Sequence, residues 1–156
     1  REKKLDNMLR KSRTKREAKI LEKASKSGIP CPRLLEVSEF TITMSIIKGQ
    51  NAEANEKNVK EAGKILEQLH SLNIIHGDYT FANLMFSDNR LFVIDFGLGY
   101  FSNKIEHKAV DVFTMLLSLH DDKLKNIFLE SYLSNSKDRE KIKSRLNNIS
   151  KRVRYS

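Results

Sequence analysis

One segment, HGDYTFANLMFSDNRLFVIDFG (residues 76–97), constrains the fold of this chain more than any other. It contains two short apolar runs, NLMF and LFVIDF, separated by the turn-forming tetrad Ser87 to Arg90. Apolar runs on either side of such a tetrad predict two strands paired as a β-hairpin. The pairing would bring Asn83 and Asp95 to the same end of the hairpin. The segment therefore predicts an amide and a carboxylate held close together.

The rest of the chain predicts helices and one further hairpin. Apolar residues recur at three- and four-residue spacing over residues 4–27 and 53–72, which is typical of amphipathic helices. Between them, LLEV (34–37) and FTITMSII (40–47) are rich in β-branched residues and predict a second hairpin. Helical spacing returns in three later segments, 106–119, 122–134 and 137–152. We therefore expect an α+β fold that is mainly helical in its C-terminal part.

Length and composition exclude some classes of protein. With 156 residues, of which 39% are hydrophobic, the chain can bury one core. Its longest apolar runs, such as Leu91 to Ile94, are far shorter than the roughly 18 residues of a membrane-spanning helix. The charged N-terminus does not resemble a secretory signal, and the single Cys31 cannot form an internal disulfide. We expect a cytoplasmic protein without membrane association, in which Cys31 is a small buried thiol.

Positive charge is concentrated at the two ends of the chain, whose net charge is +9 at pH 7. Residues 1–26 hold eleven Lys and Arg against four Asp and Glu, and residues 137–156 hold eight against two. Solvated helix faces explain such runs, but two basic segments around an acidic middle also suit a polyanionic partner. RNA or an acidic protein would both fit.

The segment 76–97 also contains a motif with a definite chemistry. His76, Asp78 and Asn83, followed by the DFG triplet that begins at Asp95, match the phosphotransfer pattern HxDxxxxN…DFG. Mg²⁺ prefers oxygen ligands, which a carboxylate and an amide supply. Asp78 would accept or orient the proton of the attacking hydroxyl, whereas Asn83 and Asp95 would hold the metal.

Each of these residues also has a simpler explanation. Asp78 and Asn83 favour turns, and Asp95 would serve as the cap of a strand end. Turn and cap roles explain each residue when it is taken alone. They explain less well why all three occur at the motif spacing around a hairpin. The glycines after Asp95 are expected to be turn residues. His76 is expected to orient the loop through hydrogen bonds, with a metal-ligand or acid-base role as the alternative.

Two further acidic residues lie on apolar helix faces. Glu17 precedes Ile20, Leu21 and Ala24 by three, four and seven residues, so it shares their stripe. An inward carboxylate requires a cation, unless the side chain reaches solvent from the edge of the stripe. Asp111 lies within the apolar segment AVDVFTMLL, where a buried acid should hydrogen-bond a specific partner. We expect Asp111 to anchor the backbone of the HGD loop.

These segments together resemble the kinase-subunit family of the KEOPS complex, the PRPK group, which is distantly similar to the RIO kinases. The resemblance rests on RTKREAKIL (13–21), GIPCPRLLEV (28–37), IIHGDYTFANLMF (74–86), VIDFGLGYFSNKIEHKAVDVF (93–113) and the basic end KRVRYS. It covers nearly the whole chain. The part GLGYFSNKIEHKAVD is the most specific, because most kinases have a long activation loop there.

The resemblance implies a reduced protein-kinase-like fold with two lobes. Residues 1–48 would form a partial N-lobe and the hinge, and residues 49–156 a mainly helical C-lobe with a basic tail. ATP would lie between the lobes, with its adenine held by the backbone of Ser45 and Ile47.

The resemblance also implies an activity and a setting. Asp78 would be the proton acceptor, Asn83 and Asp95 the Mg²⁺ ligands, and Glu17 the partner of a nucleotide-binding lysine. The family acts as a serine/threonine kinase or ATPase. Its setting is the complex that makes threonylcarbamoyl-adenosine in tRNA, where it contacts a transferase subunit and a small regulatory subunit, and its basic tail is associated with tRNA.

Two departures from the kinase pattern matter. No glycine-rich loop and no strand lysine precede Glu17, so we expect an incomplete N-lobe, with a degenerate scaffold as the alternative. Gly77 replaces the Arg of the HRD motif, which reads a phosphorylated activation loop. The segment between Gly99 and Asp111 is also too short for the usual peptide-docking region. Control by loop phosphorylation is therefore not expected, and peptides would bind differently or water would be the acceptor.

Two alternatives to this kinase or ATPase stay open. Small-molecule kinases of the aminoglycoside or choline type share HGDxxxxN, although they carry a larger helical substrate lobe than the 45 residues after Asp111 allow. The other alternative is a catalytically inert pseudokinase that presents its basic ends to tRNA and a partner subunit.

Overall fold

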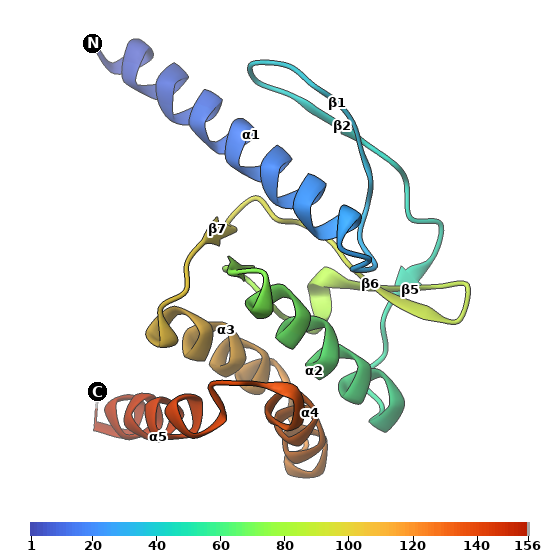
Figure 1. Cartoon of the computed structure of the whole chain (residues 1–156), viewed down its shortest axis with the longest axis vertical. Coiled ribbons are helices and arrows are strands. Elements are labelled where there is room, and N and C mark those ends of the chain that lie inside the picture. Colours follow the sequence, from blue (N-terminus) through green and yellow to red (C-terminus); the bar gives the residue numbers. More distant parts are fainter. Residues whose placement is uncertain (156) are drawn as a thin grey trace.

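A long helix and a hairpin lie at one end of the molecule and a group of helices at the other, in the computed structural model that describes residues 1–155 (Figure 1). Helix α1 (Glu2–Lys26) leads into strands β1 (Leu34–Val37) and β2 (Ile42–Met44), which pair antiparallel. The remaining elements are the strands β3 (Gln50–Asn51), β4 (Ile74–Ile75), β5 (Leu84–Ser87), β6 (Arg90–Val93) and β7 (Tyr100–Phe101), the 3₁₀ turn η1 (Phe81–Asn83), and the helices α2 (Glu56–Ser71), α3 (Ile105–Ser118), α4 (Asp122–Asn135) and α5 (Arg139–Tyr155).

Helix α1 joins the core only through its second half. Ile20 and Leu21 are buried in the same apolar cluster as residues of α2, α3 and α4. In contrast, Leu5, Met8 and Leu9 are 59%, 61% and 55% exposed. The helix predicted over residues 4–27 is therefore confirmed, but its first group of apolar residues does not reach the core.

Both predicted hairpins form, although the strand predicted over residues 40–47 is limited to Ile42–Met44 in the structure. Strand β5 pairs with β6, with Leu84 opposite Val93, and the turn residues Asp88 and Asn89 have φ angles of 48° and 61°. Asp and Asn tolerate this left-handed conformation, which a two-residue hairpin turn requires. Strand β3 pairs with the other edge of β5, and β4 pairs with β7. Strands β3, β4 and β7 have only two residues each, which is too short for a periodic pattern in the sequence.

The three predicted C-terminal helices are confirmed as α3, α4 and α5. Asn55 and Asp121 cap α2 and α4 by accepting backbone N–H hydrogen bonds with their side chains. Helices α2 and α4 approach closely at Gly63, where a Cβ atom would lie 2.7 Å from the carbonyl oxygen of Phe128. Within residues 1–155, no helix is long and apolar enough to span a membrane.

Candidate active site

Asp78 and Asn83 contact each other in the segment between β4 and β5. The side-chain nitrogen of Asn83 donates to the backbone oxygen of Asp78 at 2.9 Å and to its carboxylate at 3.0 Å. The short η1 turn brings the two residues together, because the backbone N–H of Asn83 donates a hydrogen bond to the carbonyl of Thr80 at 3.0 Å. Since its nitrogen is used in this way, the amide oxygen is the atom of Asn83 that can bind a metal.

Asp111 on α3 holds the backbone of the HGD loop, as expected from the sequence. Its carboxylate accepts the N–H of His76 at 2.7 Å and the N–H of Gly77 at 2.9 Å, one on each oxygen. Asp111 is only 1% exposed. A buried carboxylate that accepts several hydrogen bonds is strongly held, so it fixes the loop that precedes Asp78.

His76 links the HGD loop to the end of β6. Its Nδ1 accepts the backbone N–H of Asp78 at 3.2 Å, and its Nε2 lies 3.0 Å from the carbonyl oxygen of Ile94. These contacts fit a neutral imidazole with the proton on Nε2. The expected role of His76 in orienting the loop is confirmed. On the other side of Asp78, the hydroxyl of the buried Tyr79 donates to the carbonyl of Ala62 on α2 at 2.8 Å.

The backbone conformation at residue 77, where the sequence departs from the kinase pattern, requires a glycine. Its φ angle is 85°, and a Cβ atom at this position would overlap with the carbonyl oxygen of Leu98. A side chain of any kind would therefore strain the loop and force it away from the segment that contains Leu98. The conformation of this loop explains why the Arg of the HRD motif has no place here.

Asp95 lies at the end of β6 that is nearest to Asn83, as the hairpin predicts. The N–H of Ile94 donates to the carbonyl of Asn83 at 3.0 Å, which sets the two segments side by side. Asp95 has a φ angle of 62°, a conformation that non-glycine residues rarely adopt and that recurs at functional sites. Its carboxylate accepts the N–H of Gly97 at 3.2 Å and is exposed to solvent.

A pocket of about 440 Å³ between α1, β2 and the end of β6 brings together four of the predicted residues: Glu17, Ser45, Ile47 and Asp95. Its walls are largely apolar and include seven residues that were not predicted to bind a ligand, namely Leu21, Pro32, Met44, Ile46, Met85, Ile94 and Phe96. Flexible apolar side chains such as Met make favourable contacts with aromatic rings. Asp78 and Asn83 are not among the residues that line this pocket; they lie beside it.

Ser45, which follows β2, is hydrogen-bonded to the residue that precedes β1. The N–H of Ser45 is used within the hairpin, where it donates to the carbonyl of Arg33 at 2.9 Å. The hydroxyl of Ser45 accepts the N–H of Arg33, also at 2.9 Å. The N–H and the hydroxyl of Ser45 are therefore both engaged by Arg33, although Ser45 and Ile47 line the pocket.

Glu17 and Asp95 place two carboxylates on the same side of the pocket. A Cβ atom on Gly97 would lie 3.2 Å from Oδ1 of Asp95 and 3.9 Å from Oε2 of Glu17. Burial raises the pKa of Glu17, the charge of Asp95 raises it further, and Arg13 opposes both. Within the described residues, Glu17 forms no ion pair. The pair therefore creates a region of negative charge that favours a cation.

A metal ion at this site would need ligands from a second molecule. Among the residues that the structure describes, no group of three or more His, Cys, Asp and Glu side chains is arranged to bind a metal ion. The oxygens of Asp95 and Asn83 are the donor type that Mg²⁺ prefers, and Mg²⁺ commonly combines one or two protein ligands with phosphate oxygens. The donor set thus fits a metal that arrives with a nucleotide.

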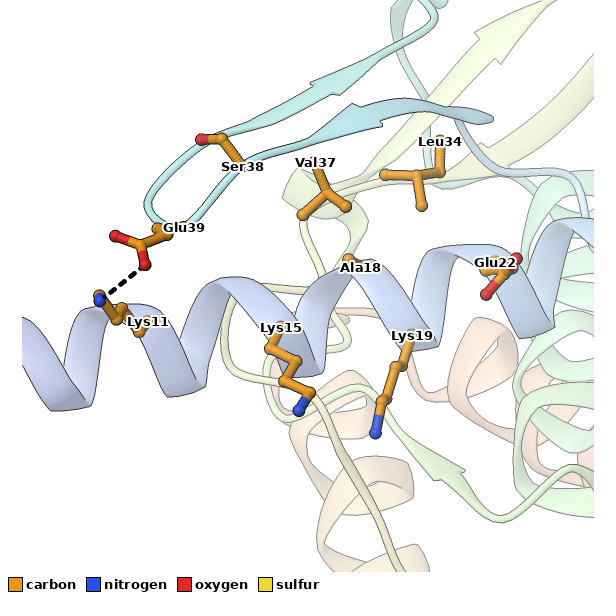
Figure 2. Close-up of a pocket in the computed structure, with 9 residues that line it drawn as sticks. All are labelled: Lys11, Lys15, Ala18, Lys19, Glu22, Leu34, Val37, Ser38 and Glu39. Carbon is orange, nitrogen blue, oxygen red and sulfur yellow. Dashed lines mark hydrogen bonds and ion pairs between the residues drawn. The ribbon is translucent and has the colours of Figure 1, made fainter.

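A second pocket lies between α1 and the β1–β2 hairpin (Figure 2). Ala18, Leu34 and Val37 lie between the helix and the hairpin, and the ammonium group of Lys11 reaches across to the carboxylate of Glu39 at 2.8 Å. None of the predicted site residues lines this pocket. We therefore place the candidate site at the pocket that Glu17 and Asp95 line.

Comparison with known proteins gives the family. The RIO domain family matches residues 1–115. The "Probable serine/threonine-protein kinase BUD32 homolog" of Archaeoglobus fulgidus is 41% identical over 160 residues, and the alignment covers 98% of this chain and 82% of that protein. This chain belongs to the Bud32 group of RIO-type kinases. The family resemblance inferred from the sequence is confirmed.

Two further relatives extend the Bud32 comparison. The "EKC/KEOPS complex subunit BUD32" of Enterocytozoon bieneusi is 36% identical over 173 residues, covering 96% of this chain and 83% of that protein. The "Probable bifunctional tRNA threonylcarbamoyladenosine biosynthesis protein" of Methanosarcina mazei is 32% identical over 163 residues. That alignment covers all of this chain but only 30% of the bifunctional protein.

Solved structures confirm the kinase-like α+β fold of this Bud32-type chain. The Rio2 kinase from Chaetomium thermophilum has a TM-score of 0.60 at 16% identity, covering 96% of this chain and 57% of that one. WaaP in complex with acyl carrier protein has a TM-score of 0.69 at 12% identity, covering 89% of this chain and 76% of WaaP.

Proposed function

We propose that this Bud32-type chain binds ATP with Mg²⁺ and acts as a serine/threonine kinase or ATPase subunit of a KEOPS assembly that supports threonylcarbamoyladenosine formation in tRNA. The observation that carries the proposal is the joint geometry of the HGD loop and Asp95. Asp78 and Asn83 are hydrogen-bonded to each other, Asp111 fixes their loop, and Asp95 is one of the residues that line an apolar pocket.

Each predicted residue has a role in this proposal. The carbonyl of Ser45 and the N–H of Ile47 would bind the edge of the adenine, and the apolar walls of the pocket would contact its faces. Asn83 and Asp95 would hold Mg²⁺, which when bound would neutralise charge on the phosphates. Asp78 would accept the proton of the acceptor hydroxyl or of water. Glu17 would pair with a cation that contacts the phosphates.

The proposed division of the chain follows the same logic. Residues 1–48 would form a partial N-lobe and the hinge, and residues 49–156 the C-lobe with its basic tail. Figure 1 shows α1 and the β1–β2 hairpin toward one end of the molecule and the helices α2 to α5 toward the other, which supports this division.

The names of the relatives support the proposed setting. One is named as a subunit of an EKC/KEOPS complex, and another as a probable bifunctional protein of tRNA threonylcarbamoyladenosine biosynthesis. We propose that this chain contacts a transferase subunit and a small regulatory subunit in the cytoplasm. Its basic ends would lie close to tRNA, because an excess of Lys and Arg favours a polyanion.

ATP turnover by the full-length protein tests the proposal. We expect Mg²⁺-dependent release of phosphate that is abolished in Asp95→Ala and strongly reduced in Asp78→Ala. Turnover that persists in Asp95→Ala would contradict the metal assignment. Phosphorylation of small alcohols or aminoglycosides would instead favour a small-molecule kinase. Absence of turnover, together with tight and salt-sensitive tRNA binding, would favour a pseudokinase.

A further inference from the structure

A line of buried hydrogen bonds connects α4 to the HGD loop. The hydroxyl of Tyr132 on α4 lies 2.7 Å from Nδ1 of His70 on α2. Nε2 of His70 lies 3.0 Å from Oδ2 of Asp111 on α3. The same carboxylate oxygen accepts the backbone N–H of His76. Tyr132, His70 and Asp111 are at most 2% exposed, so these bonds are largely shielded from bulk solvent, although His70 and Tyr132 also line a pocket of about 230 Å³.

The donors and acceptors along this line are determined by Asp111. Its carboxylate only accepts hydrogen bonds, so His70 must present an N–H at Nε2. Burial lowers the pKa of His70, which favours the neutral imidazole, and a neutral ring that donates from Nε2 has no proton on Nδ1. Nδ1 is therefore an acceptor, and the hydroxyl of Tyr132 is its donor. This hydroxyl favours the tautomer of His70 that can donate to Asp111.

We propose that Tyr132 and His70 are positioning residues, which hold Asp111 and thereby the backbone of the HGD loop in the geometry that Asp78 requires. The inference rests on the proposed function for its effect on turnover, whereas its structural part is independent of activity. Removal of the Tyr132 hydroxyl would leave Nδ1 of His70 without its donor, while Asp111 still keeps the proton on Nε2. The imidazole would then be fixed at one nitrogen instead of two, so its orientation toward Asp111, and with it the anchor of the loop, would be less well held.

The hydroxyl is not needed for the packing of α4 on α2. The two helices already meet at Gly63 and Phe128, and Ser131 donates from its hydroxyl to the carbonyl of Lys60 at 2.6 Å. The ring of Tyr132 also packs edge-to-face on His70, with centroids 5.4 Å apart, and Phe would retain this contact. Tyr132→Phe therefore removes the proposed hydrogen bond and leaves the shape of the core.

Ser131→Ala is the matched control, because it also removes a buried hydroxyl hydrogen bond between α4 and α2. In the full-length protein, we expect Tyr132→Phe to lower kcat for ATP turnover about tenfold with an unchanged KM for ATP, because the loop is misplaced. Ser131→Ala should lose similar stability and keep kcat. Combined with Asp111→Asn, Tyr132→Phe should cause no further loss, since both act on one anchor.

Amide hydrogen exchange separates this inference from the proposed function. We expect the N–H groups of His76 and Gly77 to exchange faster in Tyr132→Phe than in Ser131→Ala, at equal global stability. Equal exchange of these amides in both variants would overturn the inference, whatever the turnover. If the wild-type protein shows no ATP turnover, the proposed function fails while the exchange experiment still decides the role of Tyr132.

Discussion

The backbone of Gly77 lies so close to the carbonyl oxygen of Leu98 that a Cβ atom on residue 77 would overlap with it. The HGD loop and the segment after the DFG triplet are thus fitted to each other through a glycine. Asp111 holds the same residue from the other side through the N–H of Gly77. The position of Asp78 therefore depends on a backbone that tolerates no side chain at residue 77.

Gly77→Ala tests this fit. We expect it to lower the free energy of unfolding by about 3 kcal/mol, because both the positive φ angle and the overlap with Leu98 oppose a side chain. Gly28→Ala is the control, since Gly28 has a φ angle of 82° but open space around its Cβ position. It should cost only about 1 kcal/mol. Equal urea midpoints for the two variants would contradict the proposed close contact.

Glu17→Gln should separate stability from activity. Burial and Asp95 both raise the pKa of Glu17, so its charge opposes folding as the pH rises above the ordinary value of 4.5. We expect Glu17→Gln to unfold at the same or a higher urea concentration than the wild type at pH 7, while ATP turnover falls. Glu22→Gln, which loses only an exposed ion pair with Lys26, should leave turnover unchanged. A clear loss of stability in Glu17→Gln would show that this carboxylate supports the fold.

The thiol of Cys31 should be unreactive in the folded protein. The expected small buried thiol is confirmed, since Cys31 is 7% exposed and burial raises its pKa to about 12. Thiolate is the reactive form, so alkylation at pH 8 should be very slow until the protein unfolds. Mass spectrometry after treatment with iodoacetamide, with and without urea, measures this. Rapid labelling without urea would mean that the segment around Cys31 opens readily.

Stability should fall on acidification because of His70. Burial lowers the pKa of His70, helped by Lys108 and His76, and this outweighs the opposing effect of Asp111. In the unfolded chain His70 takes up a proton near pH 6.5, whereas in the folded protein it does so only at lower pH. The contribution of His70 is therefore complete above pH 6.5 and is lost progressively below it.

Urea unfolding at pH 7.5 and pH 5.5 checks this pH dependence. His70→Gln should reduce the difference in unfolding free energy between the two pH values. His120→Gln, at an exposed position, should leave that difference as it is in the wild type. An unchanged difference in His70→Gln would assign the acid sensitivity to other groups.

Much of the fold follows from local patterns in the sequence. The hairpin around Asp88 and Asn89 is predicted by its turn residues and apolar runs, and it carries Asn83 and Asp95 to the same end. The role of Asp111 is predictable because an acid in an apolar helix needs a specific partner.

Other features depend on contacts between distant segments, which no local pattern contains. Tyr132 and His70 are 62 residues apart in the chain, and their hydrogen bond has no signal at either position. The overlap between residue 77 and Leu98 likewise depends on how two loops meet. The apolar stripe of α1 suggests burial along the whole helix, yet Met8 lies beyond the core and is exposed.

The most direct test of the account is the Mg²⁺ dependence of nucleotide binding by the full-length protein. Calorimetry with a non-hydrolysable ATP analogue would compare the wild type, Asp95→Asn and Asp88→Asn. Both Asp residues have positive φ angles, which Asn tolerates, so the two variants differ mainly in where charge is removed. We predict that Mg²⁺ strengthens binding to the wild type and to Asp88→Asn but not to Asp95→Asn. Strengthening of the same size in Asp95→Asn would contradict the assignment of Asp95 as a metal ligand.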